Sequence, residues 1–428
     1  MSRLEELIAE LCPDGVEYRN FTTIASYVRG VTYNKSKEIK NDDSGYKLLR
    51  ANNIELTTNT LCFSDVKVID YSTKVKQDQF LRKNDILICA GSGSKEHIGK
   101  VAFIDKDLDY TFGGFMGVIR VNSDILLPRY LFHVLTGEIF KSYLLRVSNS
   151  STINNINNDT WKRFVFPVPP LPVQGEIVRI LDNFTELTAE LTAELTARKK
   201  QYEYYRDRLL HFTCNTKKYV LGDIATVTKL AGFEFTKYVK YSNEGQIIAL
   251  RGLNIKNGKL QLDDVKYIDH SDLTKLSRSK LHIGDMLFTY VGTIGQVALI
   301  DEEDKYYLAP NVALIRCDKR VLLPEYMRYY FQSNLFWDKQ INRLLQSSSM
   351  KNIPMEKIRK FEIVAPSLEV QKRFVDVLDH FDAICSDLKI GLPAEIEARK
   401  KQYEYYRDQL LTFAESGRML VDRQTDRM

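Results

Sequence analysis

The sequence predicts an α+β protein in which two pseudo-repeated α/β globules are separated by two long antiparallel coiled-coil helices. Two observations support this fold class. A stretch of sixteen residues occurs twice almost unchanged, at 197–212 and at 398–413, and its copies differ at only two positions. The segments in front of each copy also match one another, loosely but in the same order. Such a duplication is typical of a chain built from two related halves, so we expect the order globule, helix, globule, helix.

The composition is that of a folded protein with two or three domains. The chain has 428 residues, of which 44% are hydrophobic and 27% charged, an ordinary globular balance. Its longest weakly polar stretch, 286–300, is shorter than the roughly 18 to 20 residues of a membrane-spanning helix. The first residues carry acids where a secretory signal needs an apolar run, so we expect a cytoplasmic protein. The net charge of 61 − 56 = +5 permits a polyanionic partner without requiring one.

The repeats divide the chain into five segments. We expect a first globule at 1–170, a first spacer helix at 171–213, a second globule at 214–365, a second spacer helix at 366–416 and a polar tail at 417–428. Both globules mix β-branched and aromatic stretches with glycine turns, which indicates strands joined by tight connections.

The two spacer helices are predicted to pair with each other. Apolar residues in 173–212 recur at spacings of three and four, which is typical of an amphipathic helix. These forty residues would extend for about 60 Å, more than one globule of this size can cover. The second helix carries a matching apolar stripe, although Gly391 and Pro393 should interrupt it, with Pro393 restarting it at the first helical position. The residues expected in this partner and spacer interface are Leu187, Leu191, Leu195, Tyr202, Tyr205, Leu209, Tyr403, Tyr406 and Leu410.

A tetrapeptide repeat lies inside the first helix. Thr-Ala-Glu-Leu occurs at 188–191 and again at 192–195. Four helical residues add about 6 Å of rise and roughly 400° of rotation, so the apolar stripe is shifted in phase but not destroyed. A neutral slippage product in a solvated helix is one interpretation. The other is a ruler, in which one tetrapeptide rotates one globule relative to the other by about one DNA base step.

Basic loops in both globules are the candidate nucleic-acid surface. Residues 27–50 hold six cations and three acids, a net of +3, and 337–360 hold six cations and two acids, a net of +4. The Ser/Asn-rich loops 148–155 and 346–352 can bind phosphates or base edges. Solvated surface charges and ordinary capped turns are the alternatives. The candidate DNA-binding residues are Arg29, Lys35, Lys37, Ser150, Ser151, Asn155, Lys229, Arg251, Ser348, Ser349, Lys351 and Asn352.

Enzyme motifs come close to matching but fail. The glycine-rich segment 91–100 has five residues where a phosphate-binding loop needs four, and Val101 stands in place of its Ser/Thr. The only Pro-Pro pair, at 169–170, belongs to a connector and not to a methyltransferase site. Asp14 with Glu38 and Lys40 fits a loose nuclease pattern that is common by accident. The histidines and cysteines show no zinc spacing. We therefore expect no catalytic residue, no metal and no cofactor in this chain.

The near-identical helix ends carry a resemblance to a known family. Arg-Lys-Lys-Gln-Tyr-Glu-Tyr-Tyr-Arg-Asp in both helices, Cys-Pro-Asp-Gly-Val at 12–16 and Gly-Leu-Pro at 391–393 resemble the specificity subunit of type I restriction-modification systems over nearly the whole chain. The resemblance implies that the globules are target-recognition domains, each of which reads one half of a split site in double-stranded DNA. It also implies that the helices set the spacer and dock two modification (methyltransferase) subunits, and through them the restriction and translocase subunits, with no membrane involved.

The same resemblance implies that S-adenosylmethionine, ATP and Mg²⁺ are bound by partner subunits. Two alternatives stay open on the sequence alone. One is a scaffold with two protein-binding globules and no DNA specificity, and the other is a stand-alone nuclease that uses Glu38.

Overall fold

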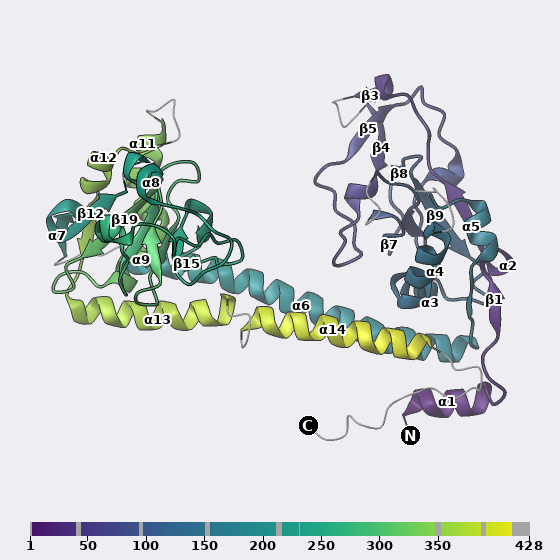
Figure 1. The fold of residues 1–428 in the computed structure, drawn as a ribbon. Coiled ribbons are helices and arrows are strands. Elements are labelled where there is room, and N and C mark those ends of the chain that lie inside the picture. The colour runs from purple at the N-terminus through teal and green to yellow at the C-terminus, as the bar shows by residue number, and fades with distance from the viewer. Residues whose placement is uncertain are drawn as a thin grey trace. The chain divides into compact units, whose positions relative to one another are not determined.

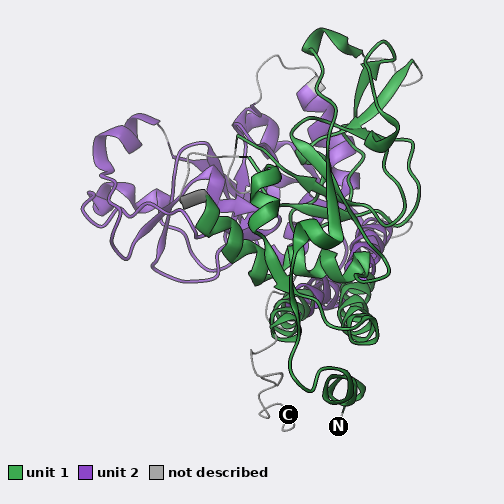
Figure 2. Cartoon of the chain, turned by 90° about the vertical axis from the view of Figure 1, so that its right-hand side faces the viewer, with its two compact units in different colours: residues 1–191, 396–428 green, residues 192–395 purple. Residues whose placement is uncertain are grey.

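The computed structural model describes residues 2–39, 44–93, 97–149, 155–210, 216–230, 232–346, 352–386 and 391–412. The chain forms two compact units, coloured separately in Figure 2. Unit 1 contains residues 1–191 and 396–428, and unit 2 contains residues 192–395. Each unit therefore holds one globule together with segments of both long helices (Figure 1).

The first globule lies in unit 1 and mixes strands with short helices. Its elements are α1 (Arg3–Leu11), β1 (Tyr18–Asn20), α2 (Phe21–Ile24), β2 (Ala25–Arg29), η1 (Lys35–Lys37), β3 (Glu38–Ile39), β4 (Gly45–Leu49), η2 (Ala51–Asn53), β5 (Lys67–Asp70), η3 (Gln77–Gln79), β6 (Ile86–Cys89), β7 (Val101–Phe103), β8 (Thr111–Phe112), β9 (Met116–Val121), α3 (Pro128–Thr136), α4 (Glu138–Asn149), α5 (Asn158–Arg163) and β10 (Val165–Pro167).

The main sheet of this globule separates two hydrophobic cores. Its strands follow the order β2-β9-β6-β7, and all neighbours are antiparallel. Every residue of β6 is buried because alternate side chains enter different cores. Ile86 and Ile88 pack with α3, α4 and α5, whereas Leu87 and Cys89 face the core shared with the smaller sheet β3-β5-β4-β8.

The second globule lies in unit 2. Its elements are β11 (Lys217–Val220), α7 (Leu221–Ile224), β12 (Ala225–Lys229), α8 (Gly232–Tyr238), β13 (Ile248–Leu250), η5 (Gly252–Asn254), β14 (Ile255–Lys256), β15 (Lys259–Leu260), η6 (Leu273–Ser279), β16 (Met286–Thr289), β17 (Val297–Leu299), β18 (Tyr306–Leu308), β19 (Val312–Cys317), α9 (Pro324–Gln332), α10 (Asn334–Phe336), η7 (Trp337–Ile341), α11 (Asn342–Gln346), α12 (Met355–Arg359) and β20 (Glu362–Ala365).

The main sheet of the second globule repeats that of the first, although the smaller sheet has two strands where the first globule has four. The main sheet has the order β12-β19-β16-β17, which corresponds strand by strand to β2-β9-β6-β7. The central strand β16 is again fully buried, with Met286 and Phe288 in one core and Leu287 in the other. A parallel pair, β13-β18, corresponds to β4-β8. The loose sequence repeat therefore encodes one shared α/β fold.

A buried glutamine fastens each long helix to the globule that precedes it. The Gln174 side chain accepts a hydrogen bond from the Leu127 amide at 2.8 Å and donates to the carbonyls of Ile125 and Pro169. Gln371 makes the equivalent three bonds in the second globule, to Leu323, Val321 and Pro366. Both side chains are fully buried with their polar atoms satisfied, which fixes the direction in which each helix leaves its globule.

The first long helix is continuous, and the second is divided. Helix α6 (Leu171–Leu210) has forty residues, as the apolar periodicity predicted. The second consists of α13 (Leu368–Ser386) and α14 (Leu392–Leu411). The predicted interruption near Gly391 is confirmed, but Pro393 is the second residue of α14 and not the first. Proline is tolerated there because the first turn has no helical partner for its missing N–H.

The helices pair antiparallel inside each unit. In unit 1 the ring of Phe184, near the start of α6, stacks on Tyr406 near the end of α14, with centroids 5.4 Å apart. In unit 2 the ring of Tyr205, near the end of α6, stacks on Phe381 of α13 at 6.1 Å. Each unit therefore contains a globule, the beginning of the long helix that follows this globule in the chain, and the end of the other long helix.

A carboxylate at each helix end caps a short helix of the globule on which it docks. In unit 1 the Glu138 amide, at the start of α4, donates to Asp408 at 3.0 Å. In unit 2 the amide of Asn334, at the start of α10, donates to Asp207 at 3.1 Å. Exposed amides at a helix start favour a negative partner, so the two aspartates of the repeated stretch perform the same task.

Within the described part of the chain, none of the helices has the length and apolarity needed to cross a membrane.

Candidate nucleic-acid interface

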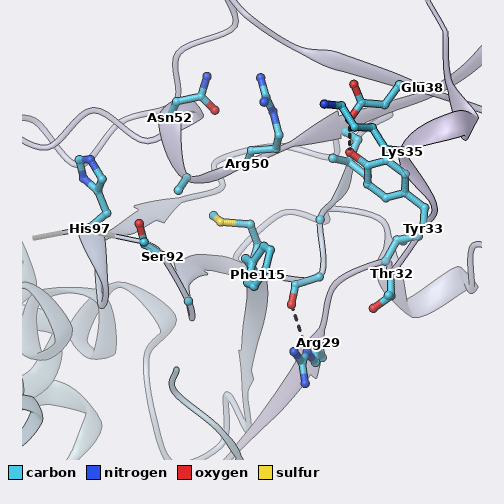
Figure 3. Close-up of a pocket in the computed structure, with 18 residues that line it drawn as sticks. Arg29, Thr32, Tyr33, Lys35, Glu38, Arg50, Asn52, Ser92, His97 and Phe115 are labelled. Atoms are coloured by element: carbon cyan, nitrogen blue, oxygen red, sulfur yellow. Dashed lines mark hydrogen bonds between the residues drawn. The ribbon is translucent and has the colours of Figure 1, made fainter. Parts of the chain in front are cut away.

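A hollow of about 650 Å³ opens on the first globule beside the end of the main sheet (Figure 3). Arg29 ends β2, Lys35 lies in η1, Arg50 follows β4, and Phe115 forms the turn between β8 and β9. The other polar residues that line the hollow are Thr32, Tyr33, Glu38, Asn52, Ser92 and His97. Three permanent cations against one carboxylate make this a positively charged site.

Hydrogen bonds hold the charged residues of the hollow in place. The Arg29 Nε donates to the carbonyl of Gly114 at 3.1 Å. The Glu38 carboxylate accepts from Lys67 at 3.0 Å and from the Tyr33 hydroxyl at 3.0 Å. These two bonds, that of Lys67 foremost, hold the pKa of Glu38 below its ordinary value, so the carboxylate stays charged at neutral pH. An acid so engaged leaves Arg29 and Lys35 available to an anionic ligand, whereas Arg50 is paired with a carboxylate of its own, Asp65.

Phe115 is the unusual residue of this hollow. It is 69% exposed, although a phenylalanine normally buries its ring. Its backbone carbonyl is fixed by the amides of Ala90 and Gly91, at 2.8 and 2.9 Å. The turn is thus rigidly placed while the ring faces solvent among polar side chains, as Figure 3 shows. An exposed, fixed aromatic ring can stack on a base or fill a groove.

The second globule has a hollow of about 420 Å³ at the matching place. It is lined by Phe235, Tyr241, Arg251, Gly252, Leu253, Val291, Thr293, Ala309, Pro310 and Asn311. Asn311 is the counterpart of Phe115, because its carbonyl accepts a hydrogen bond from the Tyr290 amide just as that of Phe115 accepts one from Ala90. The parallel pairs β4-β8 and β13-β18 place both hollows identically in the repeated fold.

The two hollows share one frame. Arg50 binds the Asp65 carboxylate at 2.8 Å, and Arg251 binds Asp264 at 3.0 Å. In each case the asparagine three residues after the arginine, Asn53 or Asn254, is buried. Its side chain accepts a hydrogen bond from the amide of the arginine and donates one to the backbone carbonyl of the aspartate. The lining beyond this frame differs, with Asn52 and Phe115 in the first hollow and Leu253 and Asn311 in the second. One scaffold therefore presents two different surfaces.

The sequence prediction found part of this site. Arg29 and Lys35 line the first hollow and Arg251 the second. Lys37 instead binds Ser72 at 2.7 Å, and Lys229 lies 5.9 Å from the Tyr290 ring. Asn155 and Asn352 pair with the strand ends at Gly91 and Val291, which belong to the two linings. The other candidates lie outside the described residues: Ser150, Ser151, Ser348, Ser349 and Lys351.

Several lining residues were missed, among them Tyr33, Asn52, His97 and Phe115. Arg50 could have been found, because its Arg-x-x-Asn spacing is repeated at Arg251. Among the residues that the structure describes, no cluster of His, Cys, Asp and Glu could hold a metal ion.

The predicted helix residues divide between internal packing and the surface. Tyr202 packs in unit 2, and Tyr403, Tyr406 and Leu410 pack in unit 1. Tyr205 stacks on Phe381 in unit 2 but remains 38% exposed. By contrast, Leu187 and Leu209 are 36% and 40% exposed, and Leu191 and Leu195 are half-buried.

Comparison with known proteins finds a matching family model and several relatives. A family model described as "Type I restriction modification DNA specificity domain" matches the chain twice, at 13–198 and 215–398. The type I restriction enzyme EcoKI specificity subunit of Escherichia coli is 26% identical over 387 residues, which cover 85% of this chain and 81% of that protein. Another type I specificity subunit of Escherichia coli is 32% identical over 269 residues, or 60% of this chain and 65% of that one.

A solved structure concerning complex assembly and conformational transition of the type I R-M system matches in fold. Its TM-score is 0.61 at 15% identity, over 93% of this chain and 98% of that chain.

Proposed function

Because the chain belongs to the type I restriction-modification DNA specificity family, with two copies of the family's domain, we propose that it reads a bipartite DNA site, one half with each globule. The chain is the specificity subunit of a type I restriction-modification complex and is not itself an enzyme. The observation that carries the bipartite reading is the pair of matched hollows with a shared Arg/Asp/Asn frame and different linings.

The shared and the different parts of the hollows suit different parts of DNA. The backbone is the same in every duplex, whereas base edges differ between targets. A frame common to both globules, centred on Arg50 and Arg251, suits the constant part of the task, which is to hold the reading loops against the duplex. Residues that differ at matched positions, such as Phe115 and Asn311, suit the reading of two unlike half-sites.

The partners follow from the same family. Double-stranded DNA and two modification subunits would bind this chain directly, and the restriction subunits would join through the complex. We expect S-adenosylmethionine, ATP and Mg²⁺ on those partners, which perform the chemistry. The compartment would be the cytoplasm, where DNA is accessible.

Selection from a random duplex library tests the proposal. The full chain, purified with its modification subunit, should enrich two defined sequences at a fixed spacing. Lys35→Ala should weaken binding and lower the salt slope by about one, because a cation lining the hollow contacts phosphate. Lys37→Ala is the matched control. It removes the same charge only two residues further along the chain, but the Lys37 side chain binds Ser72. Binding that is indifferent to sequence in the presence of the modification subunit would refute the proposal.

A further inference from the structure

Asn52 lines the first hollow with an exposed side-chain amide whose orientation is fixed (Figure 3). Its Nδ2 donates to the Asp65 carboxylate at 2.8 Å, and the same carboxylate accepts from Arg50 at 2.8 Å. Because a carboxylate only accepts hydrogen bonds, the amide must turn its NH2 group, and not its oxygen, towards Asp65. In the described part of the chain this is the one hydrogen bond of the Asn52 side chain, so its Oδ1 atom and its second N–H remain for a ligand of the hollow.

The backbone that carries Asn52 is held by a buried lysine. Lys100 is 8% exposed, and its Nζ donates to the carbonyls of Ala51 and Ile54 at 3.2 and 2.8 Å. A buried ammonium group requires such partners, since an unsatisfied charge in the interior is costly. Main chain and side chain of Asn52 are therefore both in place before a ligand arrives, which reduces the ordering that binding must impose.

The second globule keeps the frame of this loop but not the amide. Its Arg251–Asp264 ion pair repeats that of the first globule. The residue two positions after the arginine is nevertheless Leu253, which is 53% exposed and offers no hydrogen bond from its side chain. The same loop thus forms with a leucine at this position, so the fold of the loop does not explain why the first globule has an asparagine there.

We propose that Asn52 reads an adenine in the major groove of the first half-site and that Asp65 positions its amide for this contact. The inference rests on the proposed function and assigns one base to one hollow. In the major groove adenine presents an acceptor at N7 and a donor at N6, and these match the second N–H and the Oδ1 atom of Asn52.

The other three bases fit the oriented amide less well. Guanine presents two acceptors, N7 and O6. Its O6 would face the Oδ1 atom of Asn52, because one N–H of the amide is already donated to Asp65. Cytosine presents only a donor at this edge, and thymine only an acceptor beside its methyl group. The bond to Asp65 therefore favours adenine over guanine as well as over the pyrimidines.

Selection from a random duplex library tests which base is read. The full chain is purified with its modification subunit, and the half-sites chosen by the wild type and by Asn52→Ala are compared. The variant should lose about tenfold of its preference at one adenine of one half-site, which is the discrimination expected from a bidentate base contact, and should keep the other half-site. Leu253→Ala is the matched control. It removes the side chain at the same position of the other globule, so it should keep the preference for that adenine.

A duplex that carries 7-deazaadenine at this position tests the contact itself. This base lacks the N7 acceptor and keeps the N6 donor. The wild type should bind it about tenfold more weakly than the adenine duplex, whereas Asn52→Ala should bind both duplexes equally well. If Asn52 acted only through the fold of its loop, another group would contact N7, and the variant would be as sensitive to the missing atom as the wild type.

Two variants of Asp65 test the positioning role. Both remove the same negative charge, but Asp65→Asn keeps an oxygen that can accept from Asn52, and Asp65→Ala does not. We expect Asp65→Asn to retain most of the preference for adenine and Asp65→Ala to lose it. An equal loss in the two variants would overturn the positioning role.

A preference for adenine that is unchanged in Asn52→Ala would overturn the inference, as would equal sensitivity of the wild type and this variant to 7-deazaadenine. Either result would leave the bipartite site standing. A wild-type complex that enriches no sequence in either half would instead refute the proposed function.

Discussion

At the scale of single residues, the matched hollows identify which side chains differ between otherwise equivalent positions. Phe115 and Asn311 occupy the same turn of the two globules, and both are exposed. Asn311 has φ +71°, a left-handed conformation that asparagine tolerates better than most residues. Phe115 does not adopt this left-handed conformation. The matched turns therefore present a stacking ring in one globule and, on a different backbone conformation, an amide that can form hydrogen bonds with base edges in the other.

Exchange of this residue should change one half-site only. With Phe115→Asn, the first globule loses a ring and gains a hydrogen-bonding group, so we expect its preferred bases to change while those of the second globule stay the same. A change of about tenfold in preference at one position corresponds to the roughly 1 to 3 kcal/mol that one base contact discriminates. Sequencing of library-selected duplexes measures both halves together. Unchanged preference in both halves would show that this turn does not read DNA.

Sequence reasoning found some of these residues and missed others for a physical reason. Arg29, Lys35 and Arg251 are charged residues, so the sequence alone marks them as candidates for binding a polyanion. The exposure of Phe115 is not, because a phenylalanine beside glycines is normally expected in the core and only the tertiary fold leaves its ring in solvent.

At the scale of elements, His133 of α3 connects two helix segments within unit 1. Its Nε2 lies 2.8 Å from Asp182 of α6, and its Nδ1 lies 3.1 Å from the Tyr403 hydroxyl of α14. Arg129 also binds Asp182 at 2.8 Å, and Arg407 is among the charges that act on the histidine. Burial, opposed by Asp182, lowers the pKa of His133 below its ordinary value. The periodicity predicted these helices, but it could not show which side chain connects them, since their pairing is a long-range contact.

The depressed pKa predicts a pH dependence with a definite sign. The unfolded chain takes up the proton more readily than the folded one, so the contribution of His133 is complete above its unfolded pKa of about 6.5 and is lost as the pH falls towards the folded value. We expect the free energy of unfolding to decrease between pH 7 and pH 5, as measured by urea unfolding. His133→Tyr introduces the residue found at the matching position, Tyr329, and should reduce this dependence. An identical pH profile in the variant would exclude the histidine as its source.

At the scale of the whole molecule, the duplication determines the number and order of the parts, and the sequence shows this directly. It does not show that each compact unit takes helix segments from both halves, with divisions after Leu191 and after Glu395. That grouping depends on contacts between residues more than two hundred positions apart, such as Phe184 with Tyr406. No local pattern encodes such a pair, although the apolar stripes do show that each helix needs a partner.

The tetrapeptide repeat adjoins the division between the two units, so its length is predicted to affect spacing and not recognition. Deletion of 192–195 removes about 6 Å of helix and roughly 400° of rotation, which is close to one full turn plus 40°, and the apolar stripe stays nearly in phase. One base step is about 3.4 Å with a rotation near 36°. The variant complex should therefore select the same two half-sites with a spacer shorter by one or two base pairs, as read by methylation-site sequencing. An unchanged spacer would show that the repeat is a neutral insertion and that another element sets the distance. Altered half-sites would show that the repeat affects recognition itself.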